Sequence, residues 1–238
     1  MVVSRKMMEI SEMQGMAEGY GLQLSKKMRE QLAEYAEILL EWNQKVNLTS
    51  ITEPKEVEEK HFLDSLLLAK SLPEEGTLAD VGSGAGFPGV VAKIYRPQMH
   101  VSLFEPTGKR VQFLQLLAQR LGLTMEIYKE RAEEAARKQW RQGYDVVTAR
   151  AVAVLPALCE YCLPLVRVGG QFIAMKGHAG EEVAAAENAM EKLGGKLAKV
   201  ETFTLPSGAL RSLIFVHKER ETPKIYPRAG GVIKKRPL

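Results

Sequence analysis

The chain has 238 residues, of which 45% are hydrophobic, so it is long enough for one large domain with a buried core, with or without an appendage. No stretch approaches the roughly 18 consecutive apolar residues of a membrane-spanning helix. The start, Met1–Gln14, has no apolar core of a signal peptide. We therefore expect a cytoplasmic protein that does not enter a membrane.

Positive charge is concentrated at one end of the chain. The formal net charge is +4, but the last 22 residues, from His217, hold seven basic and two acidic side chains and carry +5. The remainder of the chain carries −1. We predict a basic C-terminal tail, residues 219–238, which is either a solvated end or an arm that binds phosphate groups.

Residues 1–74 have the pattern of a helical section. Ser25 is a favourable N-cap for a helix that ends near Trp42, and the apolar residues of this stretch recur with helical spacing. A second helix is expected over residues 54–72, beginning at a proline. A weaker helix is expected before Gly15.

From residue 75 onward, short apolar runs alternate with amphipathic helical stretches. Five runs are expected to be parallel strands: Leu78–Val81, Val101–Phe104, Met125–Tyr128, Asp145–Thr148 and Gln171–Met175. Two later runs, 196–205 and 212–217, have no helix between them and should pair antiparallel. The alternation predicts an α/β domain over residues 75–218, doubly wound, with helices on both faces of a mostly parallel Rossmann-like sheet.

A glycine-rich loop, D-V-G-S-G-A-G-F-P-G, follows the first predicted strand from Asp80 to Gly89. Glycine lets a ligand approach the backbone, and doubly wound folds bind ligands at the carboxyl ends of their strands. Gly84, Gly86 and Gly89 match the dinucleotide fingerprint, and Glu105 ends the next strand, roughly where a ribose-binding acid belongs. An NAD-dependent oxidoreductase is therefore one interpretation.

The acid at the start of this loop favours S-adenosylmethionine instead. A carboxylate at Asp80 would repel a pyrophosphate, but it would attract the ammonium group of the methyl donor, directly or through water. Glu105 can accept hydrogen bonds from both ribose hydroxyls. In addition, no pattern of a second, substrate-binding domain follows the sheet. We therefore predict a methyltransferase.

Further short motifs are distributed along the whole chain. They are W-N-x-x-x-N-L-T at 42–49, H-F-L-D-S-L at 61–66, the loop 80–89, G-K-R at 108–110 with Phe113-Leu114, R-A-E at 131–133, D-V-V-T-A-R-A at 145–151, M-K-G at 175–177 and Y-P-R at 226–228. Each motif is weak alone, but in this order they resemble the RsmG (GidB) family of bacterial 16S ribosomal RNA methyltransferases. The sequence departs from the family after Glu105, where Pro106 and Thr107 follow, and in its looser tail.

The resemblance implies a seven-stranded sheet with its last strand antiparallel, packed against the N-terminal helices. It implies methyl transfer to N7 of a guanine, with 16S ribosomal RNA or the small ribosomal subunit as partner. We expect a monomer. Together with the glycine loop, the family motifs give the expected donor-binding residues: Asp80, Gly82, Gly84, Phe87, Glu105, Ala132, Glu133 and Arg150.

Guanine N7 carries a lone pair at neutral pH, so its methylation needs alignment and neither a general base nor a metal ion. We expect Arg150 and Lys176, which end two predicted strands, to be the catalytic residues. Basic residues expected to bind RNA are Lys109, Arg110, Arg131, Lys176, Arg228, Lys234, Lys235 and Arg236. Because no donor motif lies in the tail, we expect donor binding to survive truncation after Tyr226.

Several assignments stay open at this point. A methyltransferase of another RNA, a protein or a small molecule would share every donor-site residue. His61 and Asp64 lie on one helical face, and we favour a structural role for them. An amine or hydroxyl target would instead make His61, Asp64 or Glu133 a candidate base. Cys159 and Cys162 lie in an apolar run and are interpreted as core thiols rather than as a redox pair or metal ligands.

Overall fold

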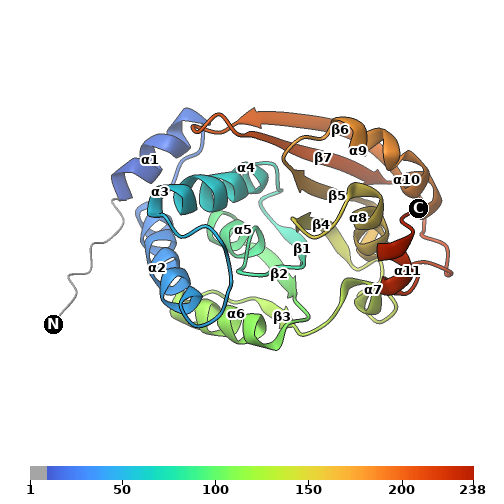
Figure 1. Ribbon diagram of the computed structural model, residues 1–238, viewed down its shortest axis with the longest axis horizontal. Helices are drawn as coiled ribbons and strands as arrows, with labels where there is room; N and C mark the ends of the chain where they lie inside the picture. Colours follow the sequence, from blue (N-terminus) through green and yellow to red (C-terminus); the bar gives the residue numbers. More distant parts are fainter. Residues whose placement is uncertain (1–9) are drawn as a thin grey trace.

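Residues 10–238, which the computed structural model describes, contain a seven-stranded sheet with the order β3-β2-β1-β4-β5-β7-β6 (Figure 1). The strands are β1 (Gly76–Val81), β2 (Met99–Phe104), β3 (Glu126–Tyr128), β4 (Tyr144–Arg150), β5 (Val166–Lys176), β6 (Gly195–Thr204) and β7 (Leu210–Lys218). Strands β1 to β5 pair in parallel, and β7 pairs antiparallel with both β5 and β6. The predicted sheet is confirmed, including its antiparallel end.

Helices cover both faces of this sheet. They are α1 (Ile10–Gly19), α2 (Lys26–Asn43), α3 (Pro54–Val57), α4 (Asp64–Lys70), α5 (Gly89–Tyr95), α6 (Gly108–Arg120), α7 (Ala132–Ala135), α8 (Leu155–Cys162), α9 (Gly180–Ala185), α10 (Glu187–Leu193) and α11 (Gly230–Lys235). Of the helices within residues 10–238, none has the length and apolar character that a membrane span requires.

The N-terminal section forms the helices expected from its pattern. The Ser25 hydroxyl caps α2 by accepting a hydrogen bond from the backbone N–H of Met28. The helix predicted over residues 54–72 is present as α3, a π-helical turn (Glu58–Leu63) and α4, and it ends at Lys70. The π-helical turn carries His61 toward the sheet side, where it is buried.

Alternate residues of the central strands face two separate cores. Leu78 packs with the core formed by the N-terminal helices, α5 and α6, whereas Ala79 packs with the core formed by α7, α8 and α10. The same alternation places Val146 in the first core and Val147 in the second. This alternation decides which side of the sheet each functional side chain of a strand reaches.

Cys159 and Cys162 are fully buried and unbonded to each other. Burial raises the pKa of the Cys159 thiol to about 12. Both side chains belong to the core that contains α8, which confirms that they are core thiols.

The tail after β7 returns to the sheet instead of extending into solvent. Its helix α11 packs against α8, at the right of Figure 1. Ile233 is fully buried, and Leu238 packs against the core of α8. The tail is therefore a structural part of the domain.

Candidate functional site

The glycine loop folds back over the end of the neighbouring strand. The backbone N–H groups of Gly82 and Ser83 donate to the carbonyl of Phe104, at 2.8 and 3.3 Å. Gly82 has a φ of +70°, in the left-handed region that favours glycine. A Cβ at this residue would also lie 2.6 Å from Cγ2 of Val152. The loop therefore requires glycine at this position for two independent reasons.

Asp80 lies beneath the loop and is fully buried. Its Oδ2 accepts a hydrogen bond of 3.0 Å from the Gly89 N–H, while no residue described by the structure contacts its Oδ1 by a hydrogen bond. A Cβ at Gly89 would approach Asp80 Oδ2 to 2.8 Å, so glycine allows this close contact. Burial raises the pKa of Asp80 to about 7, although the Gly89 N–H, Ser83 and the Arg150 charge oppose the shift.

A cavity of about 450 Å³ opens where the carboxyl ends of β1, β2, β3 and β4 meet, and we call it the donor cavity after the ligand that the sequence predicts. In doubly wound folds this edge of the sheet is the ligand-binding crevice. The cavity is lined by Val81, Gly82, Phe104, Pro106, Glu130, Arg131, Ala132, Glu133, Val152, Ala153, Val154, Ala157, Tyr161, Lys234 and Pro237.

Three of the eight expected donor-binding residues line this cavity: Gly82, Ala132 and Glu133. Glu105 does not, because its carboxylate is buried and accepts hydrogen bonds from the backbone N–H groups of Gly84 and Thr107. The Glu105 carboxylate therefore holds the loop, and its contact with a ribose stays a prediction.

Phe87 is also turned away from the donor cavity. Its ring is stacked between those of Tyr35, at 5.0 Å, and His61, at 4.4 Å between centroids. The hydroxyl of Tyr35 donates to the carbonyl of Ala85 in the same loop. Phe87 is therefore a packing contact through which the N-terminal helices hold the loop, and its contact with the donor stays a prediction.

Arg150 points to the other side of the sheet from the donor cavity. Side chains alternate along β4, so Arg150 faces the same side as Val146 and the opposite side from Val147. Its guanidinium donates to the carbonyl of Lys60, to Asp64 Oδ2 at 3.2 Å and to His61 Nδ1 at 2.9 Å. Arg150 therefore lines a different cavity, and its contact with the donor stays a prediction.

These side chains line a second cavity of about 320 Å³, which we call the basic cavity. Its residues are Ile51, Lys60, His61, Asp64, Arg150, Ala151, Met175, Lys176, Gly177 and Arg211. Asp64 pairs with Arg150 and also with Arg211, at 3.4 Å. Burial raises the pKa of Asp64 even though both guanidinium groups lower it.

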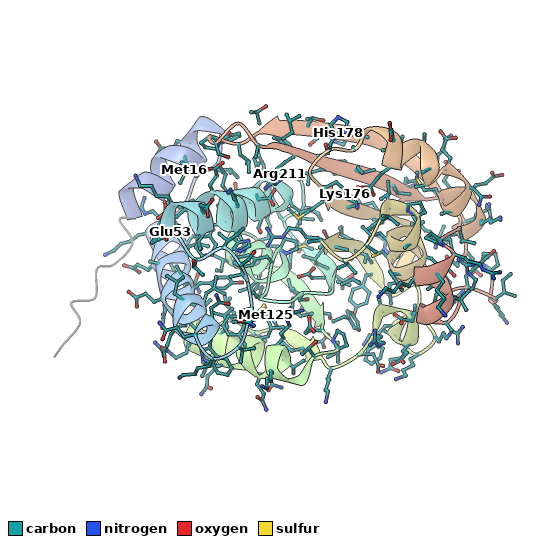
Figure 2. The ribbon with its side chains drawn as sticks, in the orientation of Figure 1. Met16, Glu53, Met125, Lys176, His178 and Arg211 are labelled. Atoms are coloured by element: carbon teal, nitrogen blue, oxygen red, sulfur yellow. The ribbon has the colours of Figure 1, made fainter. Side chains whose placement is uncertain are left out.

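Lys176 connects the two cavities through the segment that separates them. Its ammonium donates to the carbonyl of Ala153 at 2.8 Å and pairs with Glu182 at 2.7 Å. Glu182 in turn accepts from the backbone N–H of Leu155. Lys176 and Arg211 lie on neighbouring strands, β5 and β7 (Figure 2). Lys176 thus holds the 150–155 segment in place from the edge of the basic cavity.

The expected RNA-binding residues fall into different environments. Exposed side chains are those of Lys109, Arg131, Lys234, Lys235 and Arg236. Arg110 is partly exposed and lies 3.9 Å from Glu105. Arg228 differs from all of these, because its guanidinium binds the fully buried carboxylate of Glu160 through contacts of 2.6 to 3.1 Å. Arg228 therefore forms an internal ion pair, and its contact with RNA stays a prediction.

The tail also contributes to the donor cavity, which the sequence did not predict. Lys234 and Pro237 belong to its lining, together with Val152 and Tyr161. The expectation that donor binding survives truncation after Tyr226 stays a prediction, although two tail residues line this cavity. No motif marks the tail residues, because they come near the cavity only through the packing of α11 against α8.

A family model described as rRNA small subunit methyltransferase G matches residues 28–211, from α2 to β7. The chain belongs to this family. The match covers the glycine loop, both cavities except the tail residues, and the whole of the parallel sheet.

Relatives of this family are similar over nearly the full chain. A ribosomal RNA small subunit methyltransferase G of Alkaliphilus metalliredigens is 46% identical over 224 residues, which cover 92% of this chain and 94% of the relative. The protein of the same name from Halalkalibacterium halodurans is 46% identical over 237 residues, covering 97% of this chain and 100% of the relative.

Solved structures share the fold at low sequence identity. A SAM-dependent O-methyltransferase from Thermotoga maritima superposes with a TM-score of 0.52 and 16% identity, covering 77% of this chain and 72% of that chain. The tRNA methyltransferase TrmK of Bacillus subtilis has a TM-score of 0.53 and 12% identity, covering 66% of each chain. These similarities place the sheet among Rossmann-like methyltransferase folds.

Proposed function

We propose that this protein transfers a methyl group from S-adenosylmethionine to N7 of a guanine in 16S ribosomal RNA. The main support is the cavity at the carboxyl ends of β1, β2, β3 and β4. The relatives of this chain are named for methylation of small-subunit rRNA. A ribosomal RNA substrate would place the protein in the cytoplasm.

The residues around the donor cavity fit this donor. Glu130 and Glu133 supply carboxylates, which favour a cationic ligand, and Gly82 leaves the backbone accessible. Phe104 and Tyr161 offer aromatic surface against which an adenine ring can pack. S-adenosylmethionine, when bound, supplies an electrophilic methyl carbon on a sulfonium. The ionised form of the buried Asp80, behind the loop, adds a negative potential to this end of the site.

The basic cavity suits the acceptor. Arg150, Lys176 and Arg211 place three cationic groups around it, and cationic side chains recognise RNA phosphates and the O6 and N7 edge of guanine. The segment from Arg150 to Val154 contributes residues to the linings of both cavities. N7 needs no proton removed, so the task of the chain is alignment, which can lower a barrier by about 7–11 kcal/mol.

Two measurements test the proposal. Mass mapping of 16S rRNA from cells with and without this protein should show one guanine-containing fragment that loses a methyl group in its absence. Calorimetry of the purified protein should show binding of S-adenosylmethionine and no binding of NAD. Unchanged rRNA together with NAD binding would refute the methyltransferase and support an oxidoreductase.

A further inference from the structure

The C-terminal helix is in direct contact with a side chain of the donor cavity. Gly230, the first residue of α11, lies so close to Glu133 that a Cβ built on it would overlap Oε1 and would lie 3.0 Å from Cδ of that carboxylate. The next residue, Gly231, has nothing within 4 Å of its Cβ direction. The two adjacent glycines therefore have opposite surroundings, and only the first constrains Glu133.

The segment that carries Gly230 is firmly attached to the domain. The backbone N–H of Arg228 donates to Glu160 Oε1 at 2.7 Å, and its guanidinium binds the same carboxylate and the carbonyl of Arg236. Arg137 donates to the carbonyl of Pro227 at 2.6 Å. Glu160 and Ile233 are fully buried. Contacts on both sides of Gly230 therefore fix its distance from the donor cavity.

We propose that the segment Arg228–Pro237 is a fixed wall of the donor cavity and that Gly230 sets the position of the Glu133 carboxylate for donor binding. The inference rests on the proposed function, because it takes the ligand of this cavity to be the methyl donor. A side chain at residue 230 would occupy the volume in which the carboxylate lies. Glu133 is a flexible side chain, so the overlap would be relieved by displacing its carboxylate and not by unfolding α11.

A comparison of Gly230→Ala with Gly231→Ala tests this inference. Both variants replace a glycine in the first turn of the same helix, where alanine is the better helix former, so both should unfold at the wild-type temperature or slightly above it. Calorimetry with S-adenosylmethionine and with S-adenosylhomocysteine gives the affinities. Gly230→Ala should bind both about tenfold or more weakly, the effect of losing one charge-assisted hydrogen bond. Gly231→Ala should bind like the wild type.

A double-variant cycle tests whether Gly230 acts through Glu133. Adding Gly230→Ala to a Glu133→Ala protein should cause no further loss of affinity, because the carboxylate that it displaces is already absent. A further loss, or wild-type affinity of Gly230→Ala itself, would overturn the inference and leave the proposed function intact. A wild-type protein that binds neither donor nor product would overturn both.

Discussion

At the scale of single residues, His61 shows how the structure separates positioning from proton transfer. Its Nδ1 accepts a hydrogen bond from Arg150, so the ring proton resides on Nε2, which is 2.8 Å from the Thr49 hydroxyl. Burial, with the Arg150 charge as a second cause, lowers the pKa of His61 to about 3. Both ring nitrogens are engaged, and His61 has no lone pair directed at a substrate.

We therefore expect the single-turnover methylation rate, measured at saturating donor, to be flat between about pH 6.5 and 9. A general base would produce a limb that rises with pH. His61→Ala removes an acceptor from Arg150 and should lower stability by about 1–3 kcal/mol, and it should slow the reaction equally at every pH. Rapid-quench measurements on both proteins check this. A rising limb that disappears in His61→Ala would make His61 a base.

The acid side of this range has a separate cause. The unfolded chain protonates His61 near pH 6.5, whereas the folded protein does so only near pH 3. Stability therefore falls as pH drops from 6.5 towards 3, by up to about 1.4 kcal/mol per pH unit from this residue. Rates below pH 6.5 would include unfolding. Asp80, whose pKa lies at about 7, should affect donor affinity in this range, and saturating donor removes that influence from the rate.

At the scale of elements, the β1 loop and the segment after β4 meet at one point. Val152 packs where a side chain on Gly82 would lie. The segment bends at Ala151, a non-glycine residue with a φ of +56°, before it reaches the donor cavity. The shape of the cavity therefore depends on the loop and this segment together.

Gly82→Ala and Gly84→Ala form a matched pair at this contact. Both residues have positive φ, so each substitution should cost about 1–2 kcal/mol of stability. Only Gly82→Ala also collides with Val152, whereas the nearest atom to a Cβ at Gly84 is a carbonyl oxygen at 3.8 Å. We expect Gly82→Ala to weaken donor binding by about tenfold or more, while Gly84→Ala retains affinity. Calorimetry and thermal unfolding measure both, and equal affinities would contradict the model of the contact.

The helices and strands were predictable from the sequence because each has a periodic pattern. The side of the sheet that a given strand residue faces was not predictable. In a sheet covered on both faces, buried strand residues are mostly apolar on both sides, so hydrophobicity does not reveal which alternate residues face which layer of helices. Val81 and Phe104 line the donor cavity, whereas Arg150 faces the other side of the sheet and lines the basic cavity. The motifs thus identified residues near the site but not the cavity that each side chain reaches. The helix α11 was missed because it begins with two glycines and depends on the distant pair of Arg228 with Glu160.

At the scale of the whole molecule, the basic residues of the tail lie in two kinds of environment. One environment is internal, since Arg228 neutralises a carboxylate with no solvent exposure. Lys235 and Arg236, by contrast, are exposed and follow Lys234, which lines the donor cavity. Net charge alone could not separate these roles, because a buried ion pair and a solvated cation contribute equally to a sequence count.

The salt dependence of RNA binding separates them. If Lys235 contacts a phosphate, Lys235→Ala should reduce the slope of log affinity against log salt by about 0.7–0.9, because one fewer counterion is released. Arg236→Ala should do the same if its side chain contacts RNA. Arg228→Ala should leave this slope unchanged, but it strands the Glu160 carboxylate without its partner and should lower stability by about 3–5 kcal/mol. Filter binding of 16S rRNA fragments across a salt series, with thermal unfolding alongside, measures both quantities. If Arg228→Ala lowers the slope at unchanged stability, its guanidinium contacts RNA and not Glu160. If neither Lys235→Ala nor Arg236→Ala alters the slope, the tail contributes to the donor cavity alone.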